Sequence, residues 1–150
     1  MTPRLRAATP ADLPAILALE EHAFSSDRFN RRQLRYLLRQ ARSTFLVAAE
    51  KHVLLGYAVV LYRANSRRAR LYTIAVAEAA RGQGLASTLI GALAAEARRR
   101  GCRQLDLEVR ADNVAARGLY EKLGFRVAST LADYYQDGTA GLRMTLPLGH

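Results

Sequence analysis

Two closely spaced glycines between a strand-like segment and a helix-like segment constrain this chain more than any other feature. Residues 71–76 are rich in β-formers, residues 85–100 carry apolar residues at helical spacing, and the connection ends Arg81-Gly82-Gln83-Gly84. Glycines let a backbone approach a ligand closely, and the first N–H groups of a helix have no partner inside it. The segment therefore predicts a site for a phosphate-bearing cofactor. An ordinary tight turn between strand and helix is the alternative.

The glycine loop differs from two common phosphate-binding patterns. It lacks the Gly-Lys-Ser/Thr ending of a P-loop, and its glycine spacing is too short for a dinucleotide fingerprint. Neither a P-loop nucleotide site nor a Rossmann-type site is therefore expected.

Length and composition favour one soluble domain over residues 1–150, since 150 residues with half of them apolar can bury a core. No apolar run is long enough for a membrane span, and residues 1–6 lack the apolar h-region typical of a signal peptide. Cys102 is the only cysteine, and the histidines at positions 22, 52 and 150 lack metal-ligand spacing. We therefore expect a cytoplasmic protein without a bound metal.

The chain is strongly basic, with a net charge of +10, and all but two of its 23 basic residues are arginines. Such a charge attracts polyanions, so a nucleic acid, an acidic substrate or a polyphosphate cofactor would each fit, as would a compositional bias. No nucleic-acid-binding motif accompanies the charge. A specific nucleic-acid contact is therefore not expected.

Hydrophobic periodicity and turn signals predict a β-α-α-β-β-β-α-β-α-β-β order, which is typical of a mixed sheet with packed helices. Thr9-Pro10-Ala11-Asp12 is a typical helix start, and Asp112-Asn113 can cap the last helix. The predicted strands are 4–7, 44–49, 53–62, 71–76, 104–109, 125–131 and 142–146. The first helix is predicted to begin at Pro10, to continue through Glu20 and to end before Ser25, and the other helices are about 31–42, 85–100 and 114–123.

Two further segments carry a family resemblance: Leu107-Glu108-Val109-Arg110-Ala111-Asp112-Asn113 and Ala116-Arg117-Gly118-Leu119-Tyr120-Glu121-Lys122-Leu123-Gly124-Phe125. With the glycine loop, they resemble the GNAT superfamily of acetyl-CoA-dependent N-acetyltransferases, and within it the RimI-type protein N-terminal acetyltransferases. The resemblance implies an α/β fold with a GNAT-like mixed, largely antiparallel central sheet flanked by about four helices. It also implies acetyl transfer from acetyl-CoA to a primary amine in a ternary complex.

The resemblance assigns the cofactor site. The loop would wrap the pyrophosphate of acetyl-CoA, the end of the preceding strand would pair with the pantetheine arm, and Asn113 matches a pantetheine-contacting asparagine. The expected cofactor-binding residues are Ile74, Ala75, Val76, Arg81, Gly82, Gln83, Gly84, Leu85, Ala86, Ser87, Asn113, Ala116 and Tyr120.

The resemblance also assigns two catalytic residues. Glu108 matches a glutamate proposed as general base, which would take a proton from the attacking amine, and Tyr120 matches the tyrosine that would protonate the departing thiolate. A backbone N–H near Val76 would stabilise the carbonyl oxygen. Two structural alternatives remain open at this stage: Glu108 on an exposed strand face, and Tyr120 as a core residue.

The expected acceptor-site residues are Phe29, Tyr72, Thr73, Tyr134 and Tyr135, although Tyr134 and Tyr135 could also be plain strand aromatics. Residues 27–30 read Asp-Arg-Phe-Asn, where RimI-type enzymes carry Pro-Trp-Ser. The leading acceptor is a protein N-terminus, possibly ribosomal. The alternatives are a small-molecule amine, a protein lysine, or a non-catalytic CoA-binding module. We expect a monomer or homodimer that does not bind membranes.

Overall fold

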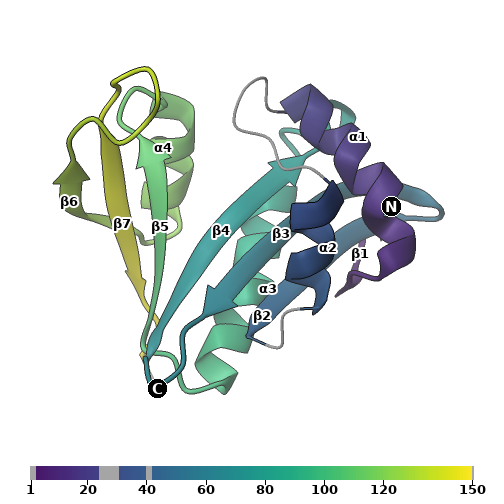
Figure 1. The fold of residues 1–150 in the computed structure, drawn as a ribbon, viewed down its shortest axis with the longest axis horizontal. Coiled ribbons are helices and arrows are strands. Elements are labelled where there is room, and N and C mark those ends of the chain that lie inside the picture. Colours follow the sequence, from purple (N-terminus) through teal and green to yellow (C-terminus); the bar gives the residue numbers. More distant parts are fainter. Residues whose placement is uncertain (1–2, 24–30, 40–41, 150) are drawn as a thin grey trace. The chain divides into compact units, whose positions relative to one another are not determined.

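A computed structural model describes residues 3–23, 31–39 and 42–149 (Figure 1). The described strands are β1 (Arg4–Ala7), β2 (Ser43–Glu50), β3 (Val53–Tyr62), β4 (Arg68–Val76), β5 (Gln104–Arg110), β6 (Arg126–Leu131) and β7 (Gly141–Pro147). The helices are α1 (Leu13–Ala23), α2 (Arg31–Arg39), α3 (Leu85–Arg99) and α4 (Val114–Lys122), with short 3-10 helices η1 (Pro10–Asp12) and η2 (Glu78–Ala80). The predicted order of strands and α-helices is confirmed. None of the described helices is long and apolar enough to cross a membrane.

The strands form one sheet in the order β1-β2-β3-β4-β5-β7-β6. Pairing is antiparallel for β1 with β2, β2 with β3, β5 with β7 and β6 with β7, whereas β4 and β5 are parallel. The mixed, largely antiparallel sheet with four α-helices that we expected is therefore confirmed.

The chain divides into two compact units, which are described separately below. Unit 1 takes residues 1–61 and 72–93, and unit 2 takes residues 62–71 and 94–150. Both β4 and α3 contribute residues to each unit.

Unit 1 packs helices on the two faces of its strands. α1 and α2 cover one face and α3 lies on the other (Figure 1). α3 packs closely because Gly56 of β3 has no side chain: a Cβ there would lie 3.0 Å from the Ala75 carbonyl oxygen and 3.4 Å from methyl carbons of Leu85 and Leu89. This packing fixes the start of α3, and with it the glycine loop. The buried core includes Leu13, Ile16, Leu34, Leu37, Phe45, Val47, Tyr57 and Val59.

The predicted cap lies at the start of the 3-10 helix η1, so α1 begins at Leu13, three residues after the predicted helix start. Thr9 and Asp12 form a capping box, in which the Thr9 backbone N–H donates to Asp12 Oδ2 at 2.8 Å. Arg6 of β1 also donates two hydrogen bonds of 2.8 Å to the Asp12 carboxylate. These hydrogen bonds lower the pKa of the buried Asp12 carboxyl below its ordinary value, against the opposing effect of burial, and they join the edge strand to the start of the helical segment.

Unit 2 is a β5–β7–β6 antiparallel sheet with α4 on one face (Figure 1). Leu105, Leu107 and Val109 of β5 are buried, and the residues between them alternate to the other face. The start of β4 pairs with β5 over only three positions, from Arg68 with Gln104 to Arg70 with Asp106.

Two further element boundaries differ from the prediction by three residues each. β4 begins at Arg68 instead of Leu71, because exposed Arg68 and Arg70 alternate with buried Ala69 and Leu71 in the two-residue period of a strand. α2 is described to Arg39, three residues short of the predicted end. Its predicted inward leucines Leu34 and Leu37 are buried.

Candidate active site

The glycine loop in unit 1 presents unpaired backbone donors, as the sequence predicts. The first backbone hydrogen bond of α3 runs from Thr88 N to the Gly84 carbonyl oxygen at 3.0 Å. The N–H groups of residues 85–87 therefore have no partner within the helix. These donors and the positive helix end favour a bound anion.

The surroundings of the loop glycines are open. Gly82 has a φ of +80° and Gly84 a φ of +77°, a left-handed conformation that favours glycine. A Cβ built at either position would have no heavy atom of the protein within 4 Å. The backbone at these two glycines is therefore not covered by other parts of the protein.

The segment before the loop is the C-terminal half of β4. Ala75 is buried, whereas Ile74 and Val76 are half-buried. The Arg81 Nε lies 3.4 Å from the Val76 carbonyl oxygen, which is a weak contact. Tyr72 and Thr73 are also half-buried, and Tyr72 packs against the core of unit 1.

Glu108 lies in unit 2 with two arginine side chains against its carboxylate. Arg70 of β4 contacts Oε1 from Nε at 2.7 Å and from Nη2 at 2.5 Å. Arg143 of β7 contacts Oε2 from Nε at 3.4 Å. The strand register causes this arrangement, because Glu108 lies opposite Arg143 and Arg70 pairs with Asp106, two residues earlier on β5.

The two contacts differ in strength and leave one oxygen less engaged. The Glu108 side chain is only 7% exposed, so water screens its ion pairs weakly. Short charge-assisted bonds fix Oε1, while the longer Arg143 contact leaves Oε2 the better placed oxygen to accept a proton. The alternative of an exposed strand face does not apply to Glu108, since its side chain is buried beneath the two arginines.

Tyr120 lies in the last turn of α4 and is 9% exposed. Its ring packs on Phe125, with ring centroids 5.7 Å apart. Burial raises the pKa of the Tyr120 hydroxyl above its ordinary value, and the charge interaction with Tyr135 acts in the same direction. The phenol therefore stays protonated at neutral pH, as a proton donor must. Tyr120 is thus both a core residue of unit 2 and a chemically suitable acid.

Asn113 caps α4, as predicted. Its side-chain Oδ1 accepts a hydrogen bond from Ala116 N at 3.1 Å. The cap uses one lone pair of this oxygen and none of the donors of the side-chain amide nitrogen, which remain suited to contact a ligand. The signal for the cap was the Asp-Asn pair in front of a helical pattern.

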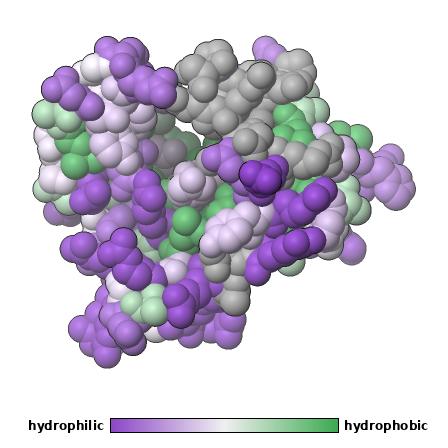
Figure 2. Space-filling model, in the orientation of Figure 1, coloured by the Kyte–Doolittle hydropathy of each residue, from purple (hydrophilic) through white to green (hydrophobic). Residues whose placement is uncertain are grey.

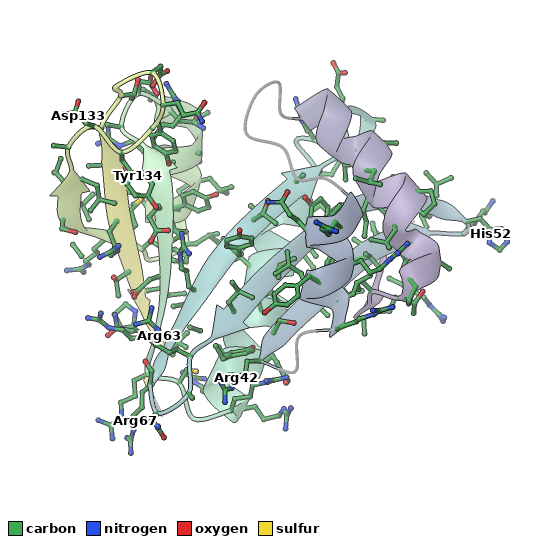
Figure 3. The ribbon with its side chains drawn as sticks, viewed as in Figure 1. Arg42, His52, Arg63, Arg67, Asp133 and Tyr134 are labelled. Carbon is green, nitrogen blue, oxygen red and sulfur yellow. The ribbon has the colours of Figure 1, made fainter. Side chains whose placement is uncertain are left out.

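Tyr134 and Tyr135 lie in the loop between β6 and β7, so the alternative of plain strand aromatics does not apply, and their role at the acceptor site stays a prediction. Their rings stand edge to face with centroids 5.0 Å apart. Tyr134 is exposed and lies against Gly141, beside the start of β7 (Figure 3). Arg110 places its guanidinium 5.0 Å from the centre of the Tyr135 ring.

Arg110 also ties this loop down. Its Nη2 donates to Asp137 Oδ2 at 2.5 Å and to Thr139 Oγ1 at 2.9 Å. The Arg110 hydrogen bond, together with Thr139, lowers the pKa of Asp137 to about 2. The loop that carries the two tyrosines is therefore fixed to β5.

The predicted site residues thus fall into two sets. Unit 2 brings together Glu108, Asn113, Tyr120 and the tyrosine pair, while the glycine loop and the end of β4 belong to unit 1. Phe29 lies outside the described residues. Sequence reasoning missed the contacts of Arg70 and Arg143 with Glu108, because both arginines lie 35 or more residues away along the chain.

The described part of the chain holds no group of three histidine, cysteine, aspartate or glutamate side chains that could bind a metal ion. His52 lies at the tip of the β2–β3 hairpin and points away from the ribbon (Figure 3). The acetyl-transfer chemistry expected here uses a base, an acid and backbone donors.

Comparisons with known proteins show the family of the chain. The model of the acetyltransferase (GNAT) family matches residues 12–125. N-alpha-acetyltransferase 30 of Schizosaccharomyces pombe is 30% identical over 124 residues, which cover 81% of this chain and 83% of that protein. The ribosomal protein bS18-alanine N-acetyltransferase of Escherichia coli is 43% identical over 83 residues, which cover 53% of this chain and 56% of that protein.

Solved structures of related proteins superpose on nearly the whole chain. The crystal structure of the Escherichia coli ribosomal-protein-S18-alanine N-acetyltransferase superposes with a TM-score of 0.88 at 29% identity, covering 99% of this chain and 95% of that one. Ard1 from Thermoplasma volcanium superposes with a TM-score of 0.89 at 26% identity, covering 98% of each chain. The chain belongs to the acetyltransferase (GNAT) family and is an acetyl-CoA-dependent N-acetyltransferase.

Proposed function

We propose that this enzyme acetylates the N-terminal α-amine of a protein, with a ribosomal protein as the first candidate. The observation that carries the proposal is the 30% identity with an N-alpha-acetyltransferase over four fifths of the chain. The bS18-alanine N-acetyltransferase of Escherichia coli, which matches half of the chain, supports the same class of acceptor.

In this proposal the glycine loop binds the pyrophosphate of acetyl-CoA. Its support is the row of unpaired N–H groups at the start of α3 and the open space beside Gly82 and Gly84. Residues 74–76 hold the pantetheine arm by backbone hydrogen bonds, and the Val76 N–H stabilises the carbonyl oxygen. Asn113 contributes its side-chain amide nitrogen to the same arm.

Glu108 is the proposed general base. A free α-amine has a pKa near 8, so a good part of it is protonated at neutral pH. Oε2 of Glu108, directly or through a water molecule, would take the proton that the amine loses as its nitrogen attacks the thioester carbonyl. Arg70 would keep the carboxylate oriented during this step through its two short contacts.

Tyr120 is the proposed general acid. As the new C–N bond forms and the C–S bond breaks, its hydroxyl would donate a proton to the departing thiolate sulfur. The raised pKa keeps this hydroxyl protonated until that moment. Tyr72, Thr73, Tyr134 and Tyr135 are proposed to contact the acceptor peptide.

The test is acetyl transfer measured by thiol release with matched acceptors. One peptide has a free Ala or Ser N-terminus, a second has the same sequence with a blocked N-terminus and an internal lysine, and a polyamine is the third acceptor. We expect turnover with the first peptide only. Turnover confined to the lysine peptide or the polyamine would refute the α-amine assignment and leave the acetyltransferase activity in place.

A further inference from the structure

An open hollow of about 740 Å³ lies in unit 2, apart from the residues assigned to catalysis. It is formed by the connection between β3 and β4 and by the residues around the end of α3. Its lining residues are Asn65, Ser66, Arg67, Arg98, Arg100, Gly101, Cys102 and Arg103. Four of these eight are arginines and none is acidic.

Backbone hydrogen bonds join the segments that form the hollow. Arg103 N donates to the Arg67 carbonyl oxygen at 2.7 Å, and Leu148 N donates to the Arg103 carbonyl oxygen at 2.8 Å. Cys102 N donates to the Ala97 carbonyl oxygen at 2.9 Å. The arginines therefore extend from a fixed frame, and replacing their side chains leaves these bonds intact.

Two of the guanidinium groups are held in place. Arg98 donates from Nε to the Leu148 carbonyl oxygen at 2.7 Å. The Arg100 guanidinium stacks over the Tyr62 ring, 4.3 Å from its centre, and pairs with Glu96. Such preorganisation lowers the entropy lost when an anion binds.

The positive charge of the hollow is largely uncompensated. Glu96 is shared between Arg99 and Arg100. Within the part of the chain that the structure describes, Arg67, Arg98 and Arg103 have no carboxylate partner. Gathering these like charges raises the electrostatic energy, which a bound anion would lower.

The C-terminal end of α3 does not cancel the attraction of the hollow for an anion. The negative end of a helix repels anions through its unpaired carbonyl groups. Here the carbonyls of residues 96–98 accept hydrogen bonds from the N–H groups of residues 100, 102 and 101 respectively. The positive charges of the arginine side chains therefore outweigh the negative end of α3 in the electrostatic potential of the hollow. Mostly hydrophilic residues lie at the surface around the end of α3 and the β3–β4 connection (Figure 2), and the Arg67 side chain extends away from the ribbon there (Figure 3).

We propose that this hollow binds the phosphodiester backbone of a nucleic acid without reading its sequence. Guanidinium groups match phosphate oxygens in geometry, and the hollow is open, so a chain with successive phosphates can pass through it. Its lining has no aromatic side chain on which a base could stack, which favours backbone contacts over base recognition.

The test measures binding of a fluorescent single-stranded RNA of about 20 nucleotides to the full chain by anisotropy, over a range of salt concentrations. The variant is R67Q/R103Q, and the control is R4Q/R126Q, which removes the same charge from exposed positions outside the hollow. For single strands, each lost phosphate contact reduces the salt slope by about 0.7. We expect R67Q/R103Q to reduce the slope by about 1.4 and to weaken binding about 25-fold at about 0.1 M salt.

The control should change binding about twofold at most, and both variants should acetylate a short peptide at the wild-type rate and melt near the wild-type temperature. Equal weakening in the two variants would overturn the proposal, because net charge alone would then explain binding. Two competition experiments also test the ligand class. Displacement of the RNA by tripolyphosphate at equal phosphate concentration, or by a glutamate-rich peptide of equal charge, would overturn the nucleic-acid assignment.

Discussion

Replacing Gly84 by alanine tests whether the glycine loop binds the cofactor, provided that the loss of acetyl-CoA affinity is distinguished from the loss of stability. Gly84 has a φ of +77°, and no protein atom would lie within 4 Å of the added methyl group. The substitution therefore costs only the left-handed conformation, roughly 1–2 kcal/mol. Gly101, with a φ of +90° and equally open surroundings, lies just after the other end of α3 and provides a matched control.

Both variants should lose similar stability, but only one should lose cofactor affinity. A loss of roughly 1–2 kcal/mol lowers Tm by about 2–8 °C in a chain of this size. The Gly84 methyl group would also keep a phosphate away from the helix N-terminus, and one lost charge-assisted hydrogen bond is worth about 1.5–3 kcal/mol. G84A should therefore bind acetyl-CoA about 10- to 150-fold more weakly, whereas G101A should bind it within about twofold of the wild type.

Thermal unfolding and isothermal titration calorimetry with acetyl-CoA measure the two effects on the same samples. Wild-type affinity in G84A would refute the assignment of the loop to the pyrophosphate. Equal losses of affinity in G84A and G101A would also refute it, because general destabilisation would then be the cause.

Three further predictions concern side chains. Tyr120→Phe should lower turnover about 100-fold while acetyl-CoA affinity stays within about twofold of the wild type. The fall in rate at alkaline pH should also disappear, since the Tyr120 hydroxyl must be protonated to donate its proton. An unchanged pH profile would contradict the role of Tyr120 as general acid. Glu108→Gln should lower turnover at least about 100-fold. Arg70→Ala should lower turnover more than Arg143→Ala, because the Arg70 contacts with Glu108 are 2.5–2.7 Å and the Arg143 contact is 3.4 Å. The reverse order in steady-state kinetics would argue that Arg70 does not position Glu108. Asp12→Asn should lower the free energy of unfolding by about 1 kcal/mol near neutral pH. Because Arg6 lowers the pKa of Asp12 in the folded state, the contribution of Asp12 to the free energy of unfolding is present above the pKa of Asp12 in the unfolded chain and is lost as pH falls through its pKa in the folded protein. If urea unfolding shows the same difference between Asp12→Asn and the wild type at all pH values, the ion pair is contradicted.

Local patterns accounted for most of the fold. The left-handed glycines before α3, the Thr9 to Asp12 capping box and the predicted start of α3 at Leu85 each depend on residues close together in the sequence, and the structure has all three. The role of the glycine loop in cofactor binding stays a prediction. The start of β4 was missed, because Arg68 and Arg70 resemble a polar turn until the burial of Ala69 shows a two-residue alternation.

The site was less predictable, because its contacts depend on strand register. Glu108 could be placed on one face of a strand, but its arginine partners follow from the pairing of β5 with β4 and β7. The placement of Tyr135 under Arg110 likewise depends on the fold of the loop between β6 and β7. The roles of these residues in catalysis and acceptor binding stay predictions for the experiments above.

Cys102 has a practical consequence for such experiments. It is the only cysteine in the sequence, is 5% exposed, and burial raises the pKa of its thiol. Since the thiolate is the reactive form, this thiol should react slowly with disulfide reagents. A thiol-release assay should therefore record free CoA with little background from the enzyme. The slow residual labelling of Cys102 would then report how often the end of α3 opens in the native protein.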